Sequence, residues 1–249
     1  MRAKRLMAAC HLHSSWSYDG EWSLEKLAAE FVRRGYQILM MSEHDKGFTE
    51  SRYLQYREAC ARASSDQMLV LPGIEYSDTD NTVHVLVWGS VPFLGEDLPT
   101  KAVIETVAST NGVAVLAHPS RLDAWRSFDP SWAGKVVGIE LWNRKSDGWA
   151  PSRKAPPLLE RMGAIAFAGL DFHDRRQLFP LAMALDMRTA MTEESVLDCI
   201  RSRRCHACAF GIPVNENLLG RALPVLRAAE RGRRTLVWLY RYLSSQRVQ

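Results

Sequence analysis

Two histidines near the start of the chain are separated by one residue, and an aspartate follows six positions later. His11 and His13 end the apolar run that begins at Leu6, and Asp19 lies beyond it. Side chains alternate between the two faces of a strand, so we expect both imidazoles to point to the same side. Imidazole and carboxylate together suit zinc, manganese or iron. This stretch therefore predicts part of a transition-metal site.

Similar side chains recur at the ends of later apolar runs. Six of the 7 histidines lie at such positions, all but His206, and Asp171 and His173 repeat the one-residue spacing. A lone histidine or carboxylate there is usually structural, for example a helix N-cap. Their joint occurrence favours a shared metal cluster. The candidate ligands are His11, His13, Asp19, His44, Glu75, His84, His118, Asp171 and His173.

Short β-prone runs alternate with helical patterns, which is typical of β/α units around a parallel sheet. In a closed parallel barrel the carboxyl ends of all strands open on one rim, so the candidate ligands would meet there. The expected strands are residues 5–12, 36–41, 68–71, 82–88, 113–117, 136–142, 164–168, 181–185 and 205–210. The expected helices are residues 23–34, 51–63, 101–110, 157–162 and 193–201.

Length and composition favour one main domain with a full-sized core. The chain has 249 residues, 47% of them hydrophobic, and a net charge of +4 that gives no strong nucleic-acid signal. Five irregularly spaced cysteines argue against a disulfide framework. No apolar run approaches the roughly 20 residues needed to span a bilayer. We therefore expect a cytoplasmic protein without a membrane span.

The ordered motifs resemble those of the PHP (polymerase and histidinol phosphatase) metal-dependent phosphoesterases, over residues 6 to about 210. The chain departs from the family pattern at Glu43, where aspartate is common, and at Leu170, where a small residue is common. Neither departure removes a ligand. The motifs are His11-x-His13, Ser17-x-Asp19-Gly20, Ser42-Glu43-His44-Asp45, Pro72-Gly73-Ile74-Glu75, His84, Ala117-His118-Pro119 and Gly169-Leu170-Asp171-x-His173.

The resemblance implies a distorted (β/α)7 TIM-like barrel whose metal site lies at the C-terminal rim of the strands. It also implies two to three divalent transition-metal ions, with Glu75 bridging two of them. The three ion positions would be formed by His11, His13, Glu75 and Asp171; by Glu75, His84 and His118; and by Asp19, His44 and His173.

The chain is expected to divide into two parts. Residues 1–212 would form the PHP metallohydrolase barrel. Residues 213–249 mix arginines with an apolar run and predict a basic amphipathic helical extension, packed on the barrel or on a partner.

Three further side chains are candidates for the site. Arg121, three residues after His118, would bind substrate phosphate, because guanidinium binds paired oxygens in a fork. Glu140, on a strand that resembles the glutamate-bearing strand of the family, would support the metal ligands, face the substrate or be structural. Glu43 would support the metal ligands or face the substrate. The basic segment 143–157 is either a wall over the site or a solvated loop.

The expected chemistry is hydrolysis by a metal-bridging hydroxide, with no protein nucleophile. The chain has no G-x-S-x-G elbow. The leading function is a phosphoesterase acting on a small phosphorylated metabolite, a nucleotide or an oligonucleotide end. One alternative is a metallohydrolase of carbamates or esters, and a less favoured one is an inactive metal-binding module.

Overall fold

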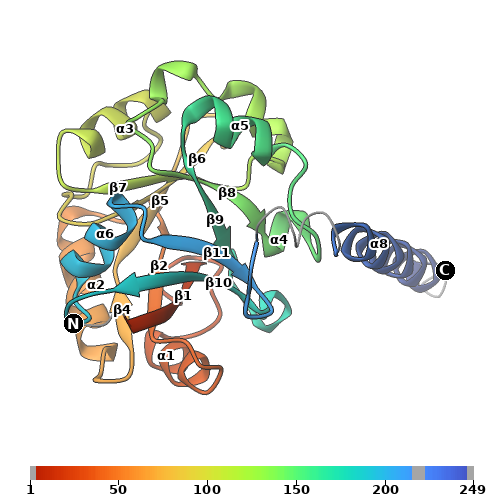
Figure 1. Ribbon diagram of the computed structural model, residues 1–249, viewed down its shortest axis with the longest axis horizontal. Coiled ribbons are helices and arrows are strands. Elements are labelled where there is room, and N and C mark those ends of the chain that lie inside the picture. Colours follow the sequence, from red (N-terminus) through yellow and green to blue (C-terminus); the bar gives the residue numbers. More distant parts are fainter. Residues whose placement is uncertain (1–3, 215–221, 246–249) are drawn as a thin grey trace.

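The computed structural model describes residues 4–214 and 222–245, so residues 1–3, 215–221 and 246–249, including parts of the predicted C-terminal extension, lie outside it. The fold is α/β (Figure 1). Its strands are β1 (Lys4–Leu12), β2 (Ile38–Met41), β3 (Glu43–His44), β4 (Leu69–Leu71), β5 (Gly73–Ser77), β6 (His84–Trp88), β7 (Val113–Leu116), β8 (Gly138–Asn143), β9 (Ile165–Gly169), β10 (Leu181–Met187), β11 (Cys205–Ala209) and β12 (Ile212–Pro213). Its α-helices are α1 (Leu24–Val32), α2 (Glu50–Ala63), α3 (Thr100–Ala108), α4 (Arg144–Asp147), α5 (Ala155–Met162), α6 (Glu193–Arg201) and α8 (Leu223–Ser245).

The strands form two six-stranded sheets. Their orders are β12-β11-β10-β1-β2-β4 and β3-β5-β6-β7-β8-β9. On one side the chain runs almost directly from β2 into β3 and from β4 into β5, which joins the sheets. On the other side, the segment after β9 pairs with the end of β1: Leu170 N donates to Cys10 O at 2.9 Å and Phe172 N donates to His11 O at 3.0 Å.

The expectation of a uniformly parallel sheet is wrong at β6 and β10. Strand β6 runs antiparallel to both β5 and β7, and β10 runs antiparallel to β1 and β11. The connection from Ser77 to His84 is too short for a helical crossover, so β5 and β6 form a hairpin. Because β6 is reversed, its first residue, His84, pairs with the last residue of β5. His84 thus lies at the edge where β5 ends.

The helices surround the sheets, and capping residues begin several of them (Figure 1). Ser23 and Thr192 are N-caps whose side chains accept hydrogen bonds from the backbone of Lys26 and Ser195. The core holds large buried side chains, among them the stacked rings of Trp88 and Phe167. The expected helices and strands are present with shifted ends, whereas β3, β5, β12 and α4 were not expected.

Helix α8 projects from the body (Figure 1). Its first half contacts the segment after α4: Trp149 N donates to Glu230 at 3.0 Å, and Glu230 is buried. Its second half exposes large apolar side chains, including Trp238 and Tyr240. Among the described helices, none is both long enough and apolar enough to cross a membrane.

Candidate metal centre

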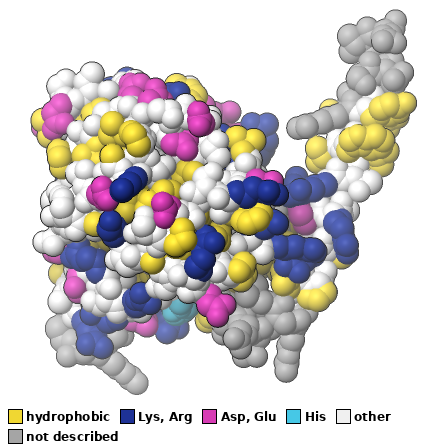
Figure 2. Space-filling model, turned by 90° about the horizontal axis from the view of Figure 1, so that it is seen from above, with side chains coloured by type: hydrophobic (Ala, Val, Ile, Leu, Met, Phe, Trp, Pro, Cys, Tyr) yellow, Lys and Arg dark blue, Asp and Glu magenta, His cyan; other side chains and the backbone are white. Residues whose placement is uncertain are grey.

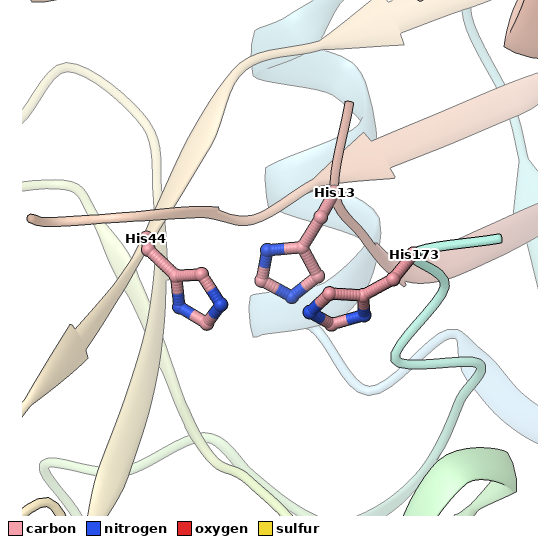
Figure 3. A group of neighbouring side chains, drawn as sticks. All are labelled: His13, His44 and His173. Atoms are coloured by element: carbon pink, nitrogen blue, oxygen red, sulfur yellow. The ribbon is translucent and has the colours of Figure 1, made fainter. Parts of the chain in front are cut away.

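Histidines from three distant parts of the chain face one another at one edge of the sheets. His13 follows β1, His44 ends β3 and His173 follows β9. The ring of His13 lies 4.3 Å from that of His44 and 4.1 Å from that of His173, between ring centroids (Figure 3). These side chains therefore meet where the strands end, as expected for ligands at one rim of a barrel.

Glu75, on β5, lies at the centre of the cluster. It is buried, and its two carboxylate oxygens approach imidazole nitrogens at 2.8–3.4 Å. Burial alone would raise its pKa, but the charges of His11 and His84 hold the pKa of Glu75 well below its usual range. The carboxylate is thus ionised. The histidines around it are His11, His13, His44, His84 and His118.

Two aspartates complete the cluster. Asp171 Oδ1 lies 3.8 Å from Nε2 of both His11 and His13. Asp19 bridges the other side, with its oxygens 3.4 Å from His44 Nε2 and 3.1 Å from His173 Nε2. All nine candidate ligands from the sequence therefore meet in one cluster.

Three of these ligands have a positive φ: His118 at 25°, and His11 and Asp171 further into the left-handed region. His11 has a φ of 61° and Asp171 has a φ of 50°, in the left-handed region that non-glycine residues rarely adopt. Such conformations cost of order 1–3 kcal/mol each and concentrate at functional sites. Here the paired segments after β1 and β9 hold them, since His13 N donates to Phe172 O at 2.8 Å.

The ligand atoms fall into three overlapping groups, within each of which they lie within 4.8 Å of one another. His84 is in none of these groups but contacts Glu75 directly, and Asp19 contacts two members of the third group. These groups differ in membership from the three ion positions that the family resemblance implies: His84 and Asp19 are outside them, and His11 and His13 each belong to two. The groups are His11, His13 and Asp171; His11, Glu75 and His118; and His13, His44 and His173.

Unbonded nitrogen atoms show that this donor set fits metal ions. His11 Nε2, His13 Nε2 and His118 Nδ1 are buried without a hydrogen-bond partner in the described structure. A buried polar atom without a partner is costly, and a metal ion would use its lone pair. A mixed shell of imidazole and carboxylate suits zinc, manganese or iron.

Glu140, on β8, supports the ligands rather than facing the cavity. It is fully buried and accepts hydrogen bonds from His11 Nδ1 at 2.9 Å, His118 N at 2.8 Å and Asn143 Nδ2 at 2.8 Å. The bond to Nδ1 leaves His11 Nε2 facing Glu75, which is how a carboxylate commonly orients a metal-binding histidine.

Glu43, one of the departures from the PHP pattern, is also fully buried. It accepts hydrogen bonds from Ser14 N at 3.0 Å, Ser14 Oγ at 2.6 Å and Ser17 Oγ at 2.5 Å. Ser17 Oγ lies 3.3 Å from His13 Nδ1. Glu43 therefore positions His13 through one hydroxyl group.

Cationic side chains line the cavity of about 200 Å³ beside the cluster. The Arg121 guanidinium donates to Asn81 O at 2.6 Å and lies 3.4 Å from His84 Nε2. Lys145 Nζ lies 3.4 Å from Asp171 Oδ1 and 3.0 Å from His173 Nε2. Both positive charges are thus placed where an anionic substrate would meet the ligands.

The sequence did not predict that several other residues line the cavity. Lys145 was only one cation in segment 143–157, but helix α4, capped by Asn143, directs it at Asp171. Asn81 has no sequence signal and lies in the β5–β6 hairpin, where its side chain is 2.7 Å from His84 Nε2. Asp45 directly follows His44, and burial raises its pKa to about 6.

Comparisons with known proteins identify the fold. No protein-family model matches the chain, and no curated protein matches it. A two-domain protein from Bacteroides vulgatus, described as containing a predicted PHP-like metal-dependent phosphoesterase, superposes with a TM-score of 0.61 at 16% identity, over 83% of this chain and 65% of its own. The present chain thus spans less than two thirds of that protein.

Two other solved structures share the fold. PsfC from Pseudomonas syringae has a TM-score of 0.60 at 15% identity, with 95% of this chain and all of PsfC covered. The lesion-specific endonuclease PfuEndoQ from Pyrococcus furiosus has a TM-score of 0.56 at 14% identity, with 80% of this chain and 56% of its own covered. The protein therefore has a PHP-like α/β fold that carries a buried cluster of histidines and carboxylates.

Proposed function

We propose that the protein is a metal-dependent phosphoesterase that hydrolyses a small phosphorylated metabolite, a nucleotide or an oligonucleotide end. One observation carries the proposal: nine candidate metal ligands, with Glu75 at their centre, cluster beside a cavity that Arg121 and Lys145 also line. Such a cavity suits a phosphate group, which needs both divalent ions and cationic hydrogen-bond donors. The PHP-like fold supports the same class of reaction.

We further propose that the two sheets are the halves of a distorted (β/α)7 barrel holding two to three zinc, manganese or iron ions. The direct passage of β2 into β3 and of β4 into β5 supports this, as do the hydrogen bonds between β1 and the segment after β9. The nine candidate ligands would hold the ions, with Glu75 shared between positions.

Each group in the cavity has a chemical task. When bound, the ions would supply a water of lowered pKa and neutralise charge on the phosphoryl oxygens. The Arg121 guanidinium binds the oxygens of the ester and Lys145 adds a second positive charge. Tyr18, whose exposed ring stacks on His44, also lines the cavity. Glu140 and Glu43 keep His11 and His13 in position.

Replacement of Arg121 by alanine tests the proposal. Loss of a charge-assisted hydrogen bond costs about 1.5–3 kcal/mol, so kcat/KM on a phosphate ester should fall roughly ten- to hundredfold. Metal content, measured by elemental analysis, should not change. A carbamate or neutral ester lacks the dianion, and its hydrolysis should hardly respond. The matched control is Arg126→Ala, an exposed arginine of the same helical segment, Arg121–Ser127.

An undiminished phosphate rate in Arg121→Ala, with activity on carbamates or esters in the wild type, would contradict the phosphoesterase assignment. It would favour hydrolysis of a non-phosphate bond at the same metal centre.

A further inference from the structure

A second cavity, of about 370 Å³, lies between the first half of α8 and the segment from Ser146 to Lys154. Neighbouring residues of the chain line this cavity and the cavity beside the metal ligands. Ser120 lines this cavity and its neighbour Arg121 lines the first; Ser146 lines this cavity and Lys145 lines the first. Consecutive Cα atoms lie about 3.8 Å apart, so the linings of the two cavities approach each other at these two places in the chain.

Positive side chains dominate the lining, and Figure 2 shows lysines and arginines gathered where α8 meets the body. The three acidic groups are already engaged. Glu230 pairs with Arg233 and Arg234, Asp123 accepts from Trp125 Nε1, and Asp147 accepts from Asn143 N. The cations of the lining are Arg153, Lys154, Arg227, Arg231 and Arg234.

Three of these arginines have no partner in the described residues. Arg153, Arg227 and Arg231 make no side-chain hydrogen bond or ion pair there, and the Nε atom of Arg227 is buried and unbonded. Burial, and then the charge of Arg153, lower the pKa of Arg227. Like charges held together without a counter-ion are unfavourable, and a bound anion would remove that cost.

We propose that this cavity binds a phosphate group, the second phosphate of a substrate whose first phosphate is at the metal centre. Guanidinium groups from two segments suit the oxygens of a phosphate. The inference rests on the proposed function, because it makes the substrate a bisphosphorylated compound or an oligonucleotide end.

Calorimetric titration of the metal-loaded protein with inorganic phosphate tests the cavity. The wild type should show two classes of site. Arg227→Gln and Arg231→Gln should each weaken one class by about tenfold or more, as expected for a lost charge-assisted bond. Arg231 is exposed, so its replacement guards against misfolding. The control Arg62→Gln, on α2 and exposed, should bind as the wild type does.

Equal phosphate binding in the wild type and in both variants would overturn the proposal. Arg121→Ala, in the same titration, reports the metal-centre class separately. If only the Arg227-dependent class is found, the proposed phosphoesterase function fails while the second anion site stands.

Kinetic measurements show whether the second cavity binds a phosphate group of the substrate or free inorganic phosphate. With a bisphosphorylated ester and a simple phosphomonoester as probes, Arg227→Gln should raise the KM of the bisphosphorylated ester about tenfold relative to that of the monoester. If the KM ratio stays at the wild-type value while phosphate binding is lost, the cavity serves free phosphate, and the assignment to the substrate is wrong.

Discussion

A single carboxylate, Glu75, lies among five imidazoles, and the cluster depends on its charge. Its Oε1 atom is 2.8 Å from His84 Nδ1 and 3.0 Å from His118 Nε2, while its Oε2 atom is 3.2 Å from His44 Nδ1. Asp171, by comparison, contacts three histidines of the cluster and Asp19 contacts two. Glu75 is therefore the residue whose chemistry matters most to the site.

We predict that Glu75→Gln is the most damaging conservative change. The amide keeps the volume but removes the charge and one acceptor oxygen, so more than one ion position should weaken and hydrolysis should be lost. Elemental analysis under metal-replete conditions measures the loss against the wild type, where we expect about three ions per chain. Glu58→Gln, at an exposed position of α2, is the control. Full metal content in Glu75→Gln would refute the bridging role.

The ligand types could be predicted from the sequence, but their contacts could not. His11 and His13 were identified by their spacing at the end of an apolar run, and Asp171 and His173 likewise. The environment of Lys145 depends on the direction of α4, and that of Asn81 depends on how the hairpin between β5 and β6 folds. Contacts between residues far apart in the chain carry no local pattern, and these are what place the two side chains in the cavity.

At the scale of elements, the glycine that ends β9, Gly169, leaves space for the Glu140 side chain of β8. A Cβ atom at Gly169 would lie 1.8 Å from Glu140 Oε1 and 3.1 Å from His11 Cβ. The strand can therefore approach β8 closely only without a side chain at this position.

We predict that Gly169→Ala weakens metal binding although it alters no ligand. The methyl group displaces the Glu140 carboxylate, which then no longer orients His11, and losses of ligand support typically cost 10–100-fold in metal affinity or activity. Metal titration followed by calorimetry measures the change. Gly232→Ala serves as the control, because a Cβ atom there meets nothing within 4 Å. Wild-type affinity in Gly169→Ala would show that Glu140 does not position His11.

The end of α4 should make stability depend on pH. Burial raises the pKa of Asp147 to about 7, whereas the ordinary value in an unfolded chain is about 3.9. The folded state therefore favours the protonated acid. The stability that this proton contributes to the folded state is fully present below about pH 4 and is lost as pH rises through 7.

We accordingly predict that Asp147→Asn has a higher Tm than the wild type at pH 8, with a difference that shrinks towards pH 4. The amide can still accept the hydrogen bond from Asn143 N but cannot ionise. Each unit of pKa shift corresponds to about 1.4 kcal/mol, so the gain is a few kcal/mol at most. Thermal unfolding across this pH range provides the measurement. A difference independent of pH would contradict the raised pKa.

Apolar periodicity predicted most elements, but not how the strands pair. The apolar runs of β1, β7 and β8 predicted strands at these positions. The two-residue β3 and the five-residue β5 were missed because Ser42 and Pro72 interrupt the apolar runs before them. The direction of β6 follows from the length of one hairpin, and a general expectation of parallel β/α units could not supply it.

At the scale of the whole molecule, α8 is separate from the metal ligands. All nine precede residue 174, and α8 begins at Leu223. Its contact with the body centres on Glu230, whose carboxylate occupies the space beside Gly148.

We predict that truncation before Arg221 leaves metal content unchanged but alters solubility or association. The exposed side chains of Leu236, Trp238 and Tyr240 are removed with the helix, and large exposed apolar groups promote association. Elemental analysis and light scattering measure the two effects. Metal loss from a folded truncated protein would contradict the first part, and an unchanged mass and solubility would contradict the second.

The pairing of β1 with segments far along the chain determines when the metal centre can form. Lys4 pairs with Met187 on β10, and the segment after β1 pairs with the segment after β9. A ribosome delivers His11 and His13 first, but their partners Asp171 and His173 emerge only after most of the chain has been made. Contacts of such long sequence separation form slowly. The metal centre can therefore form only late in synthesis or after it, once both groups of ligands have been translated.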